Sequence, residues 1–275
     1  MVSCGKPTKR MRHDMNHQDE RSRFRQRVLD GDKLLGAFCP APSPELIEVA
    51  AYSGFDFVVI DAEHGPITIS DVVHMTRAAH SAGAPVIVRV PEYSGEFIMR
   101  SLDAGVDGIL VPQVEEAAEV QRIFQAMHYP PVGVRGLAFY ARAHGFTRRT
   151  GPEAMNSANQ HVLTSVLVET PKGVENIDEI MAVQGLDMVL VGTGDLAANI
   201  GYGPETAAKV DAAVTRVAEA GKRHGVTTAI AGQSADDAAK FARRGYKVMV
   251  TGMLPHLLRF CTDFVNASRK GMEAD

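Results

Sequence analysis

Three titratable residues follow an apolar segment at the point where a buried strand is expected to end. The apolar segment is 55–60, and Asp61, Glu63 and His64 come directly after it. In parallel α/β folds, the carboxyl ends of the strands are where ligands bind. Because a histidine side chain titrates near neutral pH, His64 is a candidate general base, and we expect the neighbouring Asp61 to orient its ring.

An arginine stands at the end of a second apolar segment. Arg89 lies in segment 85–90, and a guanidinium at a strand end suits a carboxylate or a developing enolate oxygen. Arg89 would equally form an ion pair with Asp61 or Glu63, and both roles can hold together. We therefore expect Arg89 to share one rim with the residues that follow segment 55–60.

Two carboxylates follow two later apolar segments. Glu169 comes directly after segment 162–168, and Asp195 lies shortly after segment 188–191. With no cysteine or paired histidine nearby, two carboxylates favour a hard divalent ion such as Mg²⁺ or Mn²⁺, with water or substrate in the remaining positions. Either carboxylate alone would equally be a helix cap or a salt-bridge partner, but the pair on adjacent strand ends favours a metal site.

The turn Gly192-Thr193-Gly194 precedes Asp195 and has little side-chain bulk. Such a turn allows backbone amides to approach an anionic ligand. Lys172 is expected to face solvent in a loop, so no lysine is indicated as a Schiff-base nucleophile. Carbonyl chemistry at this rim would therefore depend on a metal rather than on an imine.

Short apolar segments alternate with longer amphipathic segments from residue 25 onward. The apolar segments are 34–38, 57–60, 85–90, 108–111, 162–168, 188–191, 227–230 and 248–251, and the amphipathic segments are 44–53, 69–82, 94–105, 115–127, 173–183, 205–224, 234–244 and 254–270. This alternation indicates a parallel sheet covered on both faces. At this length a single (β/α)8 TIM barrel is the simplest arrangement. An open, doubly wound sheet would be favoured by a Gly-rich phosphate loop after the first strand, and Cys39-Pro40-Ala41-Pro42 is not one.

The ends of the chain are expected to differ from the barrel. Residues 1–24 are rich in charged and polar residues and have almost no apolar periodicity, so we expect a disordered or loosely docked tail followed by a catalytic barrel domain over 25–275. At the other end of the chain, segment 254–270 is expected to form the last helix. The longest connection, 129–161, contains several arginines, and a loop of this length is usually functional or an oligomer contact.

Composition excludes several classes of protein. The net charge of −4 and the pI of about 6.2 do not resemble a nucleic-acid-binding surface, which is strongly basic. The chain has no apolar run long enough to span a membrane, so no membrane partner is expected. Cys4, Cys39 and Cys261 are too widely spaced for a disulfide framework or a zinc cluster. Free thiols in the reducing cytoplasm are the expected state.

Several segments together resemble one known family. The chain is similar to the HpcH/HpaI aldolases, the class II pyruvate aldolases related to 2,4-dihydroxyhept-2-ene-1,7-dioate aldolase. The matching segments are 51–66, 85–90, 105–113, 129–142, 168–180 and 185–201. The resemblance implies a (β/α)8 barrel assembled as a homohexamer, a trimer of dimers, with C-terminal helices exchanged between subunits.

The resemblance also implies a role for each strand end. Glu169 and Asp195 match the metal ligands of the family, for which Mg²⁺ is the first expectation and Mn²⁺ or Co²⁺ the alternatives. The turn Gly192-Thr193-Gly194 matches the segment whose amides hold the pyruvate carboxylate.

For the chemistry itself, the resemblance implies a 2-oxo-acid substrate. His64 and Asp61 match a catalytic pair, and Arg89 matches the arginine that binds the keto and carboxylate oxygens of pyruvate. The implied reaction is the retro-aldol cleavage of a 4-hydroxy-2-oxo acid, in which a base near His64 removes the C4 hydroxyl proton and the C3–C4 bond breaks to give pyruvate and an aldehyde.

Two alternatives stay open beside this reaction. Leu167 stands where the aldolases carry glutamine, and the turn at 192–194 replaces their usual Gly-Pro-Ala or Gly-Pro-Gly. Leu167 and segment 31–36 are similar to the siderophore-pathway citrate synthases of the same family, which condense oxaloacetate with acetyl-CoA, and the arginines of loop 129–161 would suit a dicarboxylate or the phosphates of CoA. The second alternative is a non-catalytic barrel that binds 2-oxo acids, although such a protein needs no base at His64.

Overall fold

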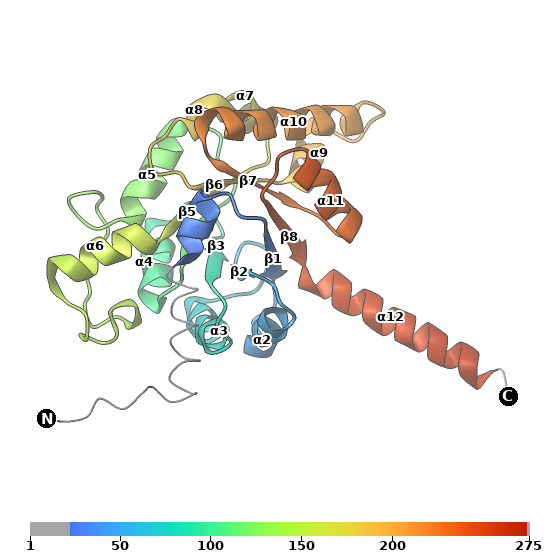
Figure 1. Cartoon of the computed structure of the whole chain (residues 1–275), viewed down its shortest axis with the longest axis horizontal. Coiled ribbons are helices and arrows are strands. Elements are labelled where there is room, and N and C mark those ends of the chain that lie inside the picture. Colours follow the sequence, from blue (N-terminus) through green and yellow to red (C-terminus); the bar gives the residue numbers. More distant parts are fainter. Residues whose placement is uncertain (1–22, 274–275) are drawn as a thin grey trace, which may run out of the picture.

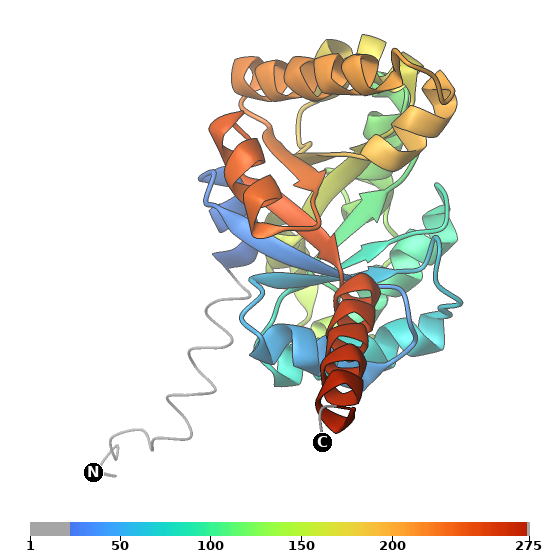
Figure 2. The same cartoon turned by 90° about the vertical axis from the view of Figure 1, so that its right-hand side faces the viewer.

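The barrel expected from the sequence is confirmed. In the computed structural model, which describes residues 23–273, parallel strands close in chain order into a barrel, and helices cover its outside (Figures 1 and 2). The strands are β1 Leu34–Cys39, β2 Phe57–Asp61, β3 Val86–Arg89, β4 Gly108–Val111, β5 Leu163–Val168, β6 Met188–Val191, β7 Thr227–Ala231 and β8 Val248–Gly252. All eight expected strands are present, and each end lies within about one residue of its predicted position.

The helices follow the expected pattern with additions. They are α2 Pro44–Tyr52, α3 Ile69–Ser81, α4 Gly95–Ala104, α5 Ala117–Met127, η1 Arg142–His144, α6 Gly151–His161, α7 Pro171–Glu175, α8 Ile177–Met181, α9 Thr193–Ile200, α10 Thr206–His224, α11 Ala235–Arg243 and α12 Met253–Met272. The single helix expected over 173–183 is divided at Asn176 into α7 and α8. Neither α6 nor α9 was expected, because α6 buries no side chain completely and α9 begins with Thr-Gly.

The amino end of the barrel is closed by aromatic side chains. Phe24 and Phe57 lie in the barrel lumen with their ring centroids 5.2 Å apart, and both are almost completely buried. Gly36 makes room for this pair, since a Cβ there would come within 2.3 Å of the Phe57 ring. Phe24 belongs to a helix over 23–29, so the last residue of the expected tail is part of this closure. Residues 1–22 of that tail lie outside the described residues, and the division at residue 25 stays a prediction.

The long connection between β4 and β5 lies at the end of the barrel opposite the carboxyl ends of the strands. It leaves the C-terminus of α5 and enters the first residue of β5, and both of these points lie at the amino end. Arg135 pairs with Asp103 at 2.7 Å, and Arg142 donates to the carbonyl of Ala104 at 2.8 Å. These two arginines therefore hold the connection to α4 and its end, away from the rim of the same subunit. A contact of this loop with a substrate or with another subunit stays a prediction.

Two histidines of this connection are buried, His128 at its start and His144 in η1. His128 bonds through Nδ1 to the carbonyl of Phe124 at 2.7 Å, and His144 bonds through Nε2 to the hydroxyl of Tyr129 at 2.9 Å. Burial is the main cause that lowers the pKa of each imidazole below its ordinary value of 6.5. The folded protein therefore binds fewer protons here than the unfolded chain does.

We expect this difference to make stability depend on pH. The contribution of the two histidines to the free energy of unfolding is complete above about pH 6.5. It is lost as the pH falls below that value, because the unfolded chain then takes up the protons. The urea concentration at the midpoint of unfolding should decrease as the pH is lowered from 7 to 5. The His144→Gln substitution should make this decrease smaller. His161→Gln, at the exposed end of α6, is the control. A decrease as large in His144→Gln as in the wild type would contradict the assignment.

Candidate active site

The strand register brings the charged residues together at the carboxyl end of the barrel. Asp61 is paired with Arg89 as the last residue of β2 and β3. Val168 is paired with Val191 at the ends of β5 and β6, so the next residues, Glu169 among them, continue from neighbouring strands. The charged residues were expected at the carboxyl ends of β2, β3, β5 and β6, and these four strand ends share one rim of the barrel.

Arg89 forms ion pairs with both neighbouring carboxylates. Its Nε and Nη2 atoms donate to the two oxygens of Asp61 at 2.8 and 2.6 Å, and its Nη1 lies 3.0 Å from Oε2 of Glu63. The guanidinium also lies over the ring of Phe38, 4.8 Å from the centroid. A guanidinium has five N–H donors, so these contacts fix its orientation and still leave donors on Nη1 and Nη2 for a ligand.

The expected pairing of Asp61 with the imidazole of His64 is wrong. Asp61 gives both carboxylate oxygens to Arg89, and its Oδ1 also accepts from the backbone amides of Glu63 and His64 at 3.2 and 3.3 Å. The strand register causes this arrangement, because it places Asp61 beside the fork of the arginine. The acid nearest the ring is Glu63, whose Oε2 lies 3.9 Å from Nε2 of His64, and the His64 side chain is 60% exposed.

Glu169 is a buried carboxylate close to other carboxylates. It is 3% exposed, and its Oε1 accepts a hydrogen bond from the backbone amide of Gln113 at 2.9 Å. Burial, followed by the charges of Glu63 and Asp195, raises the pKa of Glu169 to about 7. Burial also raises the pKa of Glu63. The rim thus has more negative charge than Arg89 balances, and an added cation would relieve it.

These groups fit a hard divalent cation. The donors are carboxylate oxygens, which Mg²⁺ and similar ions prefer, and the buried Oε2 of Glu63 has no hydrogen bond despite its ion pair. Within residues 23–273, no three His, Cys, Asp or Glu side chains form a ready metal cage. The chain would therefore supply Glu169 and Asp195, and water or substrate would fill the other positions, as magnesium sites commonly allow.

The segment expected to be a Gly-Thr-Gly turn is the start of a helix. Gly192 is the N-cap residue of α9, and Thr193, Gly194 and Asp195 form its first turn. Because free amides and the helix dipole favour an anion at a helix N-terminus, the expected contact with a carboxylate remains available in this geometry. Asp195 is exposed at the same point, so a cation and an anion could bind side by side.

Gly192 is needed for its small size. Its φ of −87° is open to other residues, but a Cβ would lie 2.6 Å from Oε2 of Glu169 and 3.3 Å from Leu167. We expect Gly192→Ala to displace the Glu169 carboxylate and to lower activity by about 10- to 100-fold, as misplacement by about 1 Å can do. Steady-state kinetics would measure this. Gly203→Ala, in the loop after α9, is the matched control, because its Cβ would also meet nothing within 4 Å, and an equal loss there would contradict the steric cause.

Two contributions to the site were not found in the sequence. The backbone amide of Gln113 donates a hydrogen bond to the Glu169 carboxylate. Gln113 has a φ of 56°, which is unusual for a residue with a side chain. Phe38 packs against the lumen and under Arg89. Gln113 had no signal, because a dihedral angle cannot be read from residue type, whereas Phe38 could have been found from its inward position at the end of the first strand.

Comparison with known proteins shows which family this chain is similar to. A family model described as HpcH/HpaI aldolase/citrate lyase matches residues 34–259. The hydroxypyruvate/pyruvate aldolase of Agrobacterium fabrum is 37% identical over 213 residues, which are 75% of this chain and 79% of that protein.

Two solved structures are similar over most of the chain. An HpcH/HpaI aldolase/citrate lyase family protein from Burkholderia cenocepacia is 31% identical, with a TM-score of 0.85 over 90% of this chain and 99% of that chain. The citrate synthase SbnG is also 31% identical, with a TM-score of 0.81 over 90% of this chain and 98% of that chain. Both activities weighed from the sequence are therefore represented among similar proteins.

Proposed function

The chain belongs to the HpcH/HpaI aldolase/citrate lyase family, and from this membership we propose that it is a metal-dependent carbon–carbon lyase that cleaves a 4-hydroxy-2-oxo acid to pyruvate and an aldehyde. The observation that carries the proposal is the buried carboxylate Glu169, whose pKa is raised to about 7 beside Asp195 and the fixed guanidinium of Arg89. This arrangement has a place for a cation and hydrogen-bond donors for an enolate.

We propose that Glu169 and Asp195 hold the divalent ion, with Mg²⁺ as the first expectation and Mn²⁺ or Co²⁺ as alternatives. A divalent ion at such a site polarises a carbonyl oxygen and stabilises negative charge that develops on it. The amides of Thr193 and Gly194, at the N-terminus of α9, would receive the substrate carboxylate, since a helix N-terminus favours an anion.

Arg89 would donate its remaining N–H groups to the oxygens of the 2-oxo acid. Because Asp61 and Glu63 already fix the guanidinium, it needs no reorganisation as charge develops on the keto oxygen. The exposed His64 would take the proton of the C4 hydroxyl. The C3–C4 bond then breaks, its electron pair moves to the enolate of pyruvate, the aldehyde leaves, and a proton returned to C3 completes pyruvate.

A citrate synthase reaction is the second candidate. It is favoured by the similarity to SbnG and by Leu167, which is 1% exposed and packs in the lumen below Glu169. One pair of assays separates the candidates: pyruvate released from 4-hydroxy-2-oxo acids, and thiol released from acetyl-CoA with oxaloacetate, each with and without EDTA. We expect EDTA-sensitive pyruvate release and no thiol. Thiol release would favour the second candidate, whereas pyruvate binding with neither reaction would favour a binding protein.

A cytoplasmic location is part of the proposal. Cys39 and Cys261 are free thiols in the described part of the chain, which suits a reducing compartment. Burial raises the pKa of Cys39 to about 12, so this thiol is inert although it lies at the end of β1. No helix among residues 23–273 has both the length and the apolarity to cross a bilayer.

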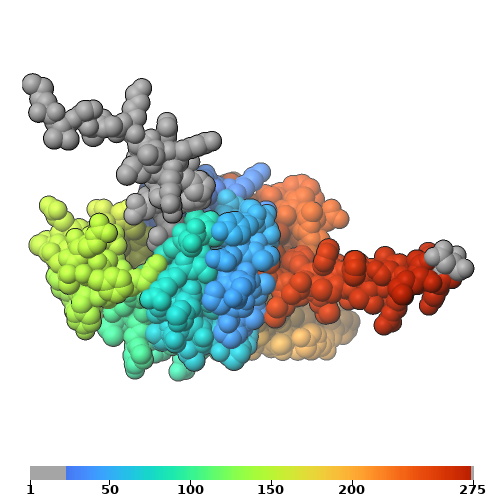
Figure 3. All heavy atoms as spheres, turned by 90° about the horizontal axis from the view of Figure 1, so that it is seen from below, coloured from blue at the N-terminus to red at the C-terminus, as the bar shows by residue number. Residues whose placement is uncertain are grey.

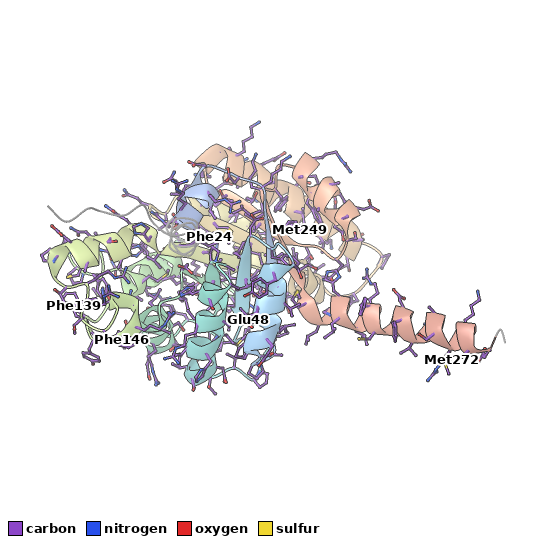
Figure 4. The ribbon with its side chains drawn as sticks, turned by 60° about the horizontal axis from the view of Figure 1, so that its bottom comes forward. Phe24, Glu48, Phe139, Phe146, Met249 and Met272 are labelled. Carbon is purple, nitrogen blue, oxygen red and sulfur yellow. The ribbon has the colours of Figure 1, made fainter. Side chains whose placement is uncertain are left out.

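We further propose that α12 joins subunits, in a hexamer if the family resemblance holds. The helix extends away from the barrel as a separate arm (Figure 3), with Met272 near its far end (Figure 4). Large apolar side chains along it are exposed, namely Leu254, Leu257, Leu258, Phe260, Phe264 and Val265. An exposed apolar surface on one helix is typical of a protein interface, and a second copy of the chain is the proposed occupant.

We expect the double substitution Leu258→Ser with Phe264→Ser to shift the protein toward the monomer, because it removes two large apolar contacts from that interface. Light scattering after gel filtration would measure the mass. The control is Arg259→Ser with Asn266→Ser on the same helix. A wild-type protein that is already monomeric at micromolar concentration would contradict the role of α12.

A further inference from the structure

We propose that the aldehyde partner of this reaction is small and uncharged, and that aldehydes carrying their own carboxylate are poor partners. This rests on the proposed lyase function and adds the substrate class. The basis is the unequal distribution of charge around the carboxyl end of the barrel, where one arc holds every group proposed to bind the 2-oxo acid and the other arc has none.

The arc without charge consists of β7, β8 and β1, which are consecutive in the closed barrel. The loop after β1 is Pro40-Ala41-Pro42-Ser43, the loop after β7 is Gly232-Gln233-Ser234, and β8 runs directly into α12. The charged groups come instead from β2, β3, β5 and the start of α9 after β6. When these groups hold a 2-oxo acid, its C4 atom and the rest of its chain would extend toward the uncharged arc.

The lumen below this arc is apolar. Phe38 and Ala231 are partly buried side chains packed on the lumen core, and Leu167 belongs to that core. None of the three can donate a hydrogen bond to a carboxylate. A carboxylate that enters such surroundings without a partner loses its hydration with little in return, and its binding is therefore unfavourable.

The helices that begin beside the arc add mainly acids. Glu45 lies in the first turn of α2, and Asp236 and Asp237 lie in the first turn of α11, where Asp237 accepts from the amides of Gln233 and Ser234. In the first turn of α12, His256 bonds through Nε2 to the hydroxyl of Thr251 at 2.8 Å. An anion approaching this arc would meet repulsion from these acids rather than a free cation.

Cations elsewhere on the rim already have partners. Arg89 is paired with Asp61 and Glu63, and Lys172 of α7 lies 2.5 and 3.4 Å from Glu116 and Glu115. On α5, Arg122 lies over the ring of Tyr93. The lysine also belongs to the β5 side, away from the uncharged arc. Arg89, Lys172 and Arg122 are therefore already engaged by side chains of this rim, and none of the three is free to bind the tail of a carboxylated aldehyde.

The test compares aldehydes of similar length that carry or lack a carboxylate. Aldol addition of pyruvate to glycolaldehyde and glyoxylate, and to butanal and succinic semialdehyde, would be measured with the metal-loaded full-length protein. We expect kcat/KM to be at least about tenfold higher for the neutral member of each pair, since a carboxylate that finds no partner loses its hydration when it enters the site. Raising the ionic strength from about 0.02 M to about 0.3 M should narrow the gap.

A substitution pair tests the arc itself. Gln233→Arg adds a cation to the loop after β7 and should raise kcat/KM for succinic semialdehyde by about fivefold or more. Gln160→Arg makes the same charge change on α6, an exposed position at the amino end of the barrel, and should leave that value unchanged. Equal gains in both variants would show that net charge, not the arc, sets the preference, and would overturn the inference.

A readout that needs no aldehyde separates this inference from the function on which it rests. Exchange of the pyruvate methyl protons with solvent deuterium reports enolate formation alone. Exchange together with equal or faster turnover of the carboxylated aldehydes overturns only the inference. Absence of exchange in the metal-loaded protein overturns the proposed function and the inference with it.

Discussion

Replacing Glu169 with glutamine is expected to lower kcat for pyruvate release by at least about 10³-fold. Groups that merely orient metal ligands commonly cost 10- to 100-fold when changed, and Glu169 is proposed to be a ligand itself. The amide is nearly the same size and can still accept from Gln113, so the fold should be retained. The loss should therefore appear in catalysis and in metal affinity, with little change in the free energy of unfolding.

Metal binding measured by calorimetry distinguishes this loss from a general defect. In the Glu169→Gln variant, the affinity for Mg²⁺ or Mn²⁺ should fall together with kcat. Glu92→Gln is the matched control, because Glu92 is an acid on the same rim, in the loop after β3, with no assigned role. A Glu169→Gln variant that binds metal and turns over like the wild type would show that Glu169 is not a ligand.

Replacing Arg89 with methionine is expected to harm both stability and activity. The substitution leaves Asp61 and Glu63 buried without their cation, and removing one partner of a buried ion pair commonly costs about 3–5 kcal/mol. Activity should fall by about 10²- to 10³-fold, the usual effect of losing a donor to a developing oxyanion. Arg89→Lys keeps the charge but not the fork, so it should recover much of the stability and little of the activity.

Urea unfolding and steady-state kinetics on the same samples would measure the two effects. Arg100→Met is the control, because Arg100 forms only an exposed pair with Glu96 one turn away on α4 and such pairs contribute little. Full activity in Arg89→Lys would mean that a point charge suffices, and the role given to the remaining N–H groups of the guanidinium would then be wrong.

Much of the architecture could be predicted from the sequence, because parallel barrels have strong local signals. Each buried strand is a short run of apolar residues, and many helices begin with a capping residue such as Ser43 or Ser234 and end before a glycine. The helix α6 lacked such a signal, since none of its side chains is completely buried. For the start of α9, the glycines at 192 and 194 indicated a turn, although the local backbone is helical.

The members of the site were more predictable than their contacts. Their positions at strand ends follow from the order of residue types, which is why Asp61, Arg89 and Glu169 could be placed on one rim. The partner of Asp61 depends on strand register, and the register brings it to Arg89 rather than to the ring of His64. The support that Gln113 gives to Glu169 depends on a backbone angle. Neither is encoded in residue spacing.

The central claim is that this rim forms the enolate of pyruvate only when a divalent ion is held beside Arg89. Proton NMR of pyruvate in deuterated water tests it most directly, with protein first treated with EDTA and then supplied with Mg²⁺, Mn²⁺ or Co²⁺. The account predicts no exchange of the methyl protons in the treated protein, exchange after metal is restored, and none in Glu169→Gln. Exchange at an undiminished rate without metal would contradict it.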